Sequence, residues 1–79
     1  MVVNEETLPI LLQKDIEALK ACYRGESKYD EDCLWCELYS TINIFQHGGG
    51  ITKEVADYLR NKYLGMGSDD EYFFKDYVK

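Results

Sequence analysis

The stretch "TLPILLQKDIEALKACYRG" at residues 7–25 decides the fold class, because its apolar residues recur with helical spacing. Thr7 is a candidate N-cap, Pro9 lies in the first turn, and Gly25 is expected to end the helix. Charged residues occupy the side opposite a narrow apolar stripe, which consists of Leu8, Leu12, Ile16, Leu19 and Tyr23. We predict an amphipathic helix at about 8–24.

Two further helices are predicted at about 31–46 and 52–64. Asp30 is the expected cap of the second helix, and "HGGG" at residues 47–50 ends it. The segment "STINIF" at residues 40–45 is rich in β-branched residues, so the second half of this second helix is compatible with a strand as well. Gly65 is expected to follow the last residue of the third helix in the C′ position.

A short C-terminal helix is predicted at about 69–78. Its start is indicated by the capping-box pattern "SDDE", in which Ser68 and Glu71 satisfy each other's backbone donors. There is no internal repeat and no linker long enough to separate domains. The expected fold is therefore all-α: one domain over residues 1–79, a small three-helix bundle with a short C-terminal helix.

Charge and composition exclude several function classes. The 79 residues carry a net charge of −6, and lysine and arginine never cluster. A protein that binds nucleic acid directly needs a basic surface, so we expect a protein partner with a basic surface instead. No apolar run is long enough for a transmembrane helix and no signal peptide is recognisable, so we expect no membrane association and a cytoplasmic location.

The cysteines suggest a structural metal site. In "CLWC", Cys33 and Cys36 lie one helical turn apart and off the apolar stripe, and Cys22 ends the preceding helix, so three sulfurs could converge on Zn²⁺. His47 would complete the ligand set by residue type, but roughly 16 Å of helix separates it from Cys36. It would ligate only if the chain folds back or two chains share the site.

Other interpretations of the cysteines stay open. Free cysteine often behaves as a small apolar residue, and Cys33 with Ile44 would form a second apolar stripe against a neighbouring helix. Redox chemistry is the least favoured interpretation, because the βαβ setting of thioredoxin-like motifs is absent. Catalysis is not expected either, since helical spacing places no nucleophile near His47.

A tyrosine-bearing acidic face is the best candidate for partner binding. Tyrosine supplies amphipathic contact area at low entropic cost, and acidic groups accelerate encounter with a basic surface. The alternative is that most of these rings pack in the core or at its rim. The candidate contact residues are Tyr29, Asp30, Glu31, Asp32, Asp69, Asp70, Glu71, Tyr72 and Tyr77.

The segment "LYSTINIFQHGGGITKEVADYLRNKYLG" at residues 38–65 resembles a pattern in small acidic proteins of phages and integrative elements of Firmicutes. Proteins of this kind include anti-CRISPR inhibitors of RNA-guided nucleases. The resemblance implies a genetic setting and assigns no functional residue. It makes a non-enzymatic inhibitor, of the type that acts on type II effectors, our first expectation. An immunity or antitoxin-like protein that binds a toxin or host factor is the alternative.

A transcriptional regulator is the third possibility. The segment at residues 51–65 resembles the first helix of a helix-turn-helix motif. The following segment, which would have to supply the recognition helix, is acidic and would be repelled by phosphate.

Overall fold

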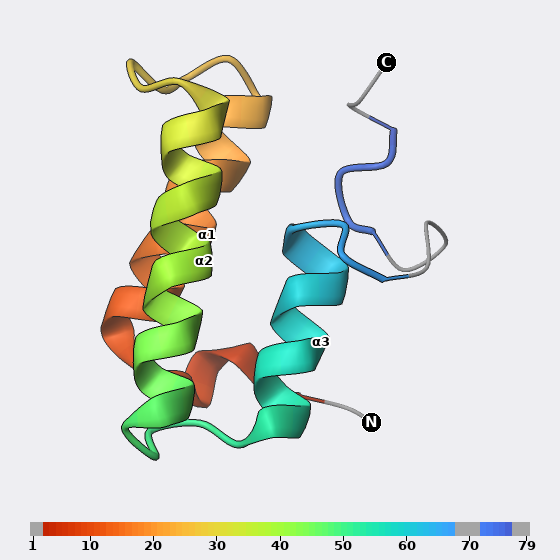
Figure 1. Cartoon of the computed structure of the whole chain (residues 1–79). Coiled ribbons are helices and arrows are strands. Elements are labelled where there is room, and N and C mark those ends of the chain that lie inside the picture. The colour runs from red at the N-terminus through yellow and green to blue at the C-terminus, as the bar shows by residue number, and fades with distance from the viewer. Residues whose placement is uncertain (1–2, 68–71, 77–79) are drawn as a thin grey trace.

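The computed structural model describes residues 3–67 and 72–76, and it is all-helical over these ranges. A 3₁₀ turn at Glu5–Thr7 is followed by α1 (Ile10–Tyr23), α2 (Glu31–His47) and α3 (Lys53–Tyr63), as Figure 1 shows. The three predicted helices are confirmed, and the described ranges contain no strand. The open question at residues 40–45 is resolved in favour of helix, because α2 continues unbroken to His47.

The first helix begins two residues later than predicted. Pro9 occupies its N-cap position without a side-chain cap, and Thr7 instead belongs to the preceding 3₁₀ turn. There the Thr7 hydroxyl donates to the Asn4 carbonyl at 2.7 Å, and the Asn4 side chain accepts from the Glu6 amide. Asn4 therefore caps a turn that the helical periodicity did not reveal, and this turn positions Glu5.

A glycine turn reverses the chain between α2 and α3. Gly49 has a φ of +82°, a conformation that only glycine adopts without strain. Its amide donates to the Gln46 carbonyl, and the Gly50 amide donates to the Phe45 carbonyl at 2.8 Å. These two bonds form a Schellman motif, so "HGGG" both ends α2 and directs the chain toward α3.

The core lies mainly between α1 and α2, which run antiparallel, with α3 alongside (Figure 1). Trp35 links α2 to the end of α3, because its indole N–H donates to the Leu64 carbonyl at 3.1 Å. No described helix combines the length and apolar character needed to cross a membrane. The predicted stripe of the first helix is buried except for Tyr23, which is half-buried. The buried residues are Leu8, Leu12, Ile16, Leu19, Leu34, Leu38, Ile42, Ala56, Leu59, Tyr63, Leu64 and Phe74.

A polar network also joins α2 to α3. The Arg60 guanidinium donates to the side-chain oxygens of Asn43 and Gln46 on α2, the latter at 2.7 Å. It also pairs with Asp57 one turn earlier on α3 at 3.2 Å. Arg60 is half-buried, and its fixed fork of donors sets the position of α3 along α2.

The predicted C-terminal helix is not formed over residues 72–76: Tyr72 belongs to no regular element, and residues 73–76 form turns. The Phe74 ring stacks on Tyr23 with centroids 4.1 Å apart, while Phe73 lies 5.5 Å from Tyr63. Neighbouring side chains on a helix diverge by about 100°. A helix here would therefore not place both Phe73 and Phe74 against the adjacent ends of α1 and α3. The capping box at Ser68–Glu71 and the predicted residues 77 and 78 lie outside the described residues.

Candidate functional site

The loop between α1 and α2 carries the most exposed of the predicted contact residues. The Tyr29 side chain is 72% exposed and is the only exposed tyrosine in the described ranges. Its backbone is nevertheless held in place: the Tyr29 amide donates to Ser27 Oγ at 3.1 Å, and the Cys22 thiol lies 3.7 Å from the Tyr29 carbonyl. The ring is therefore presented from an ordered loop, as a contact residue requires.

The three acids that follow Tyr29 are all exposed, but they differ in what they contact. Glu31 accepts a hydrogen bond from the Tyr23 hydroxyl at 2.6 Å. Asp30 stands at the N-cap of α2 without a side-chain cap bond, and neither Asp30 nor Asp32 forms an ion pair with another described residue. Their charges are thus available to a partner.

The other predicted contact residues are placed differently or lie outside the described part of the chain. Tyr72 is half-buried, and its hydroxyl lies 3.1 Å from that of Tyr23. Its ring packs at the chain's own C-terminal turn, so it is not a free surface group. The predicted contact residues not described are Asp69, Asp70, Glu71 and Tyr77.

The cysteines are free thiols at the end where α1 leads into α2. Cys22 is half-buried at the end of α1, while Cys33 and Cys36 are exposed on the first turns of α2. Within residues 3–67 and 72–76, no three or more His, Cys, Asp or Glu side chains are grouped to hold a metal ion. The described conformation therefore does not bring the three sulfurs together with a further ligand.

His47 lies at the opposite end of α2 from the cysteines. Since α2 is continuous from Glu31 to His47, the eleven residues from Cys36 span about 16 Å. Within one chain His47 is thus too far from the cysteines to share an ion with them.

The surroundings of the Cys22 thiol make it less acidic than an ordinary thiol. Burial raises its pKa, and the negative charges of Glu31 and Asp30 raise it further. The thiolate is the reactive form of cysteine, so this environment suppresses the reactivity of Cys22.

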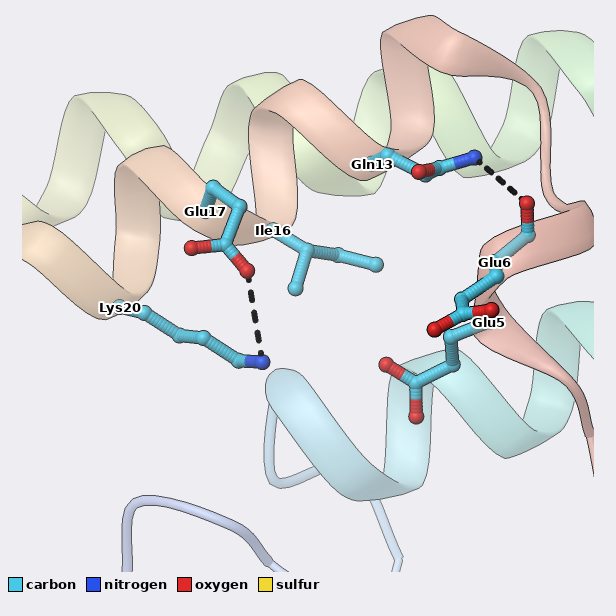
Figure 2. Close-up of a pocket in the computed structure, with 6 residues that line it drawn as sticks. All are labelled: Glu5, Glu6, Gln13, Ile16, Glu17 and Lys20. Atoms are coloured by element: carbon cyan, nitrogen blue, oxygen red, sulfur yellow. Dashed lines mark hydrogen bonds and ion pairs between the residues drawn. The ribbon is translucent and has the colours of Figure 1, made fainter.

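A second feature is a pocket of about 240 Å³ between the N-terminal turn and α1 (Figure 2). Gln13 donates from its side chain to the Glu6 carbonyl at 3.2 Å, and Lys20 pairs with Glu17 at 3.6 Å. Figure 2 shows Glu5 at the edge of this pocket, with its carboxylate directed toward α3. The pocket is therefore a gap between the N-terminal turn and α1, and its polar lining residues are largely bonded within the chain.

Glu5 anchors the N-terminal turn to α3. Its carboxylate accepts from Lys62 Nζ at 2.6 Å, from the Tyr58 hydroxyl at 2.9 Å and from the Tyr63 hydroxyl. We call these four residues the Glu5 anchor. Sequence reasoning missed it, because helical spacing cannot show a contact between residues 58 positions apart, as Glu5 and Tyr63 are.

The Glu5 anchor shifts the pKa values of its members in consistent directions. Burial alone would raise the pKa of Glu5, but the hydrogen bonds from Lys62, Tyr63 and Tyr58 outweigh it and lower the pKa. Burial would lower the pKa of Lys62, but its hydrogen bond to Glu5 raises it. Burial and the hydrogen bond to Glu5 both raise the pKa of Tyr63. The ionised carboxylate and ammonium are thus the stable forms.

Two carboxyl groups that sequence reasoning also missed meet between α1 and α2. Asp15 on α1 raises the pKa of Glu37 on α2, mainly through its negative charge. A pocket of about 320 Å³ lies beside them, lined by Ala18, Tyr29, Cys33, Leu34 and Glu37. The proximity of Asp15 and Glu37 could have been predicted from the sequence, because an antiparallel pairing of the two helices places these positions opposite each other.

No family model matches this chain, and no curated protein or solved structure matches it either. Residue roles therefore come from the chain's own geometry.

Replacing Glu5 by glutamine should weaken the attachment of the N-terminal turn. Charge-assisted hydrogen bonds contribute about 1.5–3 kcal/mol each, so we expect Glu5→Gln to lower the free energy of unfolding by roughly 2 kcal/mol at neutral pH. Because the folded-state pKa lies below the ordinary value of 4.5, this stabilisation is present above about pH 4.5 and is lost as the pH falls through the folded-state pKa.

Urea unfolding of both proteins between pH 3 and pH 7 measures this difference. The control is Glu6→Gln, which removes an exposed carboxylate on the same turn and should change the free energy of unfolding little. Equal losses for the two variants would contradict the anchor.

The three thiols should differ in alkylation rate. We expect iodoacetamide at pH 7.5 to modify Cys33 and Cys36 before Cys22, because Cys22 is less exposed and its pKa is raised. Peptide mass spectrometry over a time course gives the three rates, and in 6 M guanidinium chloride they should converge. Fastest modification at Cys22 in the folded protein would refute this assignment.

Proposed function

We propose that this chain is a non-enzymatic inhibitor that binds a basic surface of a partner protein through residues 29–32, which we call the acidic loop. The observation that carries the proposal is the exposed Tyr29 ring, held on an ordered backbone beside the unpaired carboxylates of Asp30 and Asp32. An aromatic anchor with a charged rim is the usual composition of an energetically dominant contact in protein interfaces.

The negative charge of the chain favours a partner protein with a basic surface. The whole chain carries −6, and its negative field would accelerate encounter with a basic surface and repel nucleic acid. Asp30 and Asp32 are exposed and contribute mainly to the rate of association, whereas Tyr29 can bury its ring and slow dissociation.

The partner we favour is an RNA-guided nuclease of the host bacterium, so the chain would act in the cytoplasm. Such nucleases hold the guide–target duplex in a positively charged channel, which an acidic protein can occupy without base-specific contacts. The resemblance of residues 38–65 to small acidic phage proteins directs the proposal to this class. An immunity or antitoxin-like role would use the same loop against a toxin.

Cleavage assays with purified type II effector nucleases test the proposal. We expect stoichiometric inhibition that weakens as salt is raised from 50 to 300 mM. Tyr29→Ala should raise the half-inhibitory concentration at least ~10-fold, equivalent to about 1.4 kcal/mol. The double variant Asp30→Asn/Asp32→Asn should slow association.

The matched control is Glu6→Gln/Glu54→Gln, which removes two exposed negative charges away from the acidic loop and should inhibit like the wild type. Absence of both binding and inhibition across the effectors would count against the nuclease as partner. Rescue of cells from a co-expressed toxin, with the same dependence on Tyr29, would support the immunity role instead.

Zinc binding by Cys22, Cys33 and Cys36 is a separate proposal. It would require the exposed thiols of α2 to converge with Cys22, with a water molecule or a second chain supplying the fourth ligand. Native mass spectrometry of protein purified without chelator should then show one zinc ion per chain or per shared site. A metal-free monomer would remove the proposal.

A further inference from the structure

One face of the α1–α2 pair carries apolar side chains and carboxylates along its whole length. Two helical stripes at spacings of three, four and seven residues form this face. The α1 stripe consists of Leu11, Asp15, Ala18 and Cys22, and the α2 stripe consists of Cys33, Glu37 and Ile44. We call the channel between the two stripes the α1–α2 groove.

The two stripes face the same groove, because their members touch. The negative charge of Asp15 on α1 raises the pKa of Glu37 on α2, which shows that the two carboxyl groups lie close together across it. Toward the acidic loop, Ala18 from α1 and Cys33 from α2 line the same pocket of about 320 Å³, with Tyr29 at its rim. The groove is therefore continuous with the acidic loop to which the proposed function assigns partner binding.

The two ends of the groove are apolar and exposed. Ile44 is 68% exposed and Leu11 is 59% exposed at one end, and Tyr29 is exposed at the other. By contrast, the opposite side of α2 is covered, since Trp35 and Asn43 contact α3 there. Large apolar side chains exposed on one face are typical of surfaces that bind another protein.

The middle of the groove has negative charge without a counter-charge. Asp15 and Glu37 form no ion pair with any lysine or arginine in the described ranges. Two carboxyl groups in contact repel each other when both are ionised, and a cationic side chain between them would convert this repulsion into attraction. The groove thus matches an occupant that is positive at its centre and apolar at both ends.

We propose that the α1–α2 groove binds an amphipathic helix of the partner protein, with an arginine or lysine between Asp15 and Glu37 and apolar residues toward Ile44 and Tyr29. This inference rests on the proposed function, and it adds the shape and register of the partner segment. Cys33 and Ile44 are eleven residues apart on α2, about 16 Å, so three helical turns of the partner cover the groove.

The charge pattern also argues against a second copy of this chain as the occupant. Self-association through this face would bring four carboxyl groups, two Asp15 and two Glu37, into one interface, and their like charges would repel each other. A basic partner helix is therefore favoured over a homodimer.

A designed peptide tests the groove directly. The probe is a 15-residue Ala/Gln helix with leucine at positions 4 and 11 and arginine at position 8, and the control peptide has glutamine in place of the arginine. In titrations followed by ¹⁵N NMR, the probe should shift amides in residues 11–22 and 33–44. The control peptide should bind at least ~10-fold more weakly.

Protein variants complete this test. Asp15→Asn/Glu37→Gln should weaken probe binding at least ~10-fold, and Ile44→Ser should weaken it without changing the preference for arginine. Glu6→Gln/Glu17→Gln, which removes two exposed charges elsewhere, should bind like the wild type. Equal binding of both peptides, or amide shifts confined to α3, would overturn the groove proposal.

The groove and the proposed function can fail separately. If the acidic-loop variants lose nuclease inhibition while Asp15→Asn/Glu37→Gln inhibits fully, the groove proposal is overturned and the proposed function stands. If the probe binds with the expected arginine dependence but no nuclease is inhibited, the groove stands and its natural partner belongs to another class.

Discussion

The fold depends on the burial of one apolar stripe from α1 against one from α2. Leu12, Leu19, Leu38 and Ile42 are fully buried at this seam, and each buried side chain of this kind stabilises the fold by about 1.5–3 kcal/mol relative to an exposed one. Everything else is added to this pair. Hydrogen bonds from Arg60 and Trp35 fix α3 against α2, and the Glu5 anchor fastens the N-terminal turn to α3.

Residues 38–65 form the junction between α2 and α3, and their contacts hold α3 in place. Asn43 and Arg60 bond α2 to α3, while Lys62 and Tyr63 hold Glu5. Gly65 has a φ of +68° directly after the end of α3. This segment thus joins two helices, and the partner-facing residues we propose lie mostly outside it.

Helical periodicity predicted the three helices and most of the core, because each stripe is a local property of its own helix. The C-terminal turn was missed because Phe73 and Phe74 are positioned by rings on α1 and α3 that lie far away in the sequence. The same reason hid the Glu5 anchor and the contact between Asp15 and Glu37. Of the two candidate contact tyrosines in the described ranges, Tyr29 is exposed, whereas Tyr72 is half-buried and its hydroxyl meets that of Tyr23.

The Glu5 anchor has a consequence for local opening of the molecule. Its bonds join an eleven-residue helix and a short turn, both at the edge of the core, whereas the groove is built on the two longest helices. Release of Glu5 would uncover the Tyr63 hydroxyl without separating α1 from α2, and the bonds of Arg60 and Trp35 would still hold α3 against α2. The end of the groove at Leu11 lies nearest to this opening, whereas the acidic loop lies beyond the other end of α1.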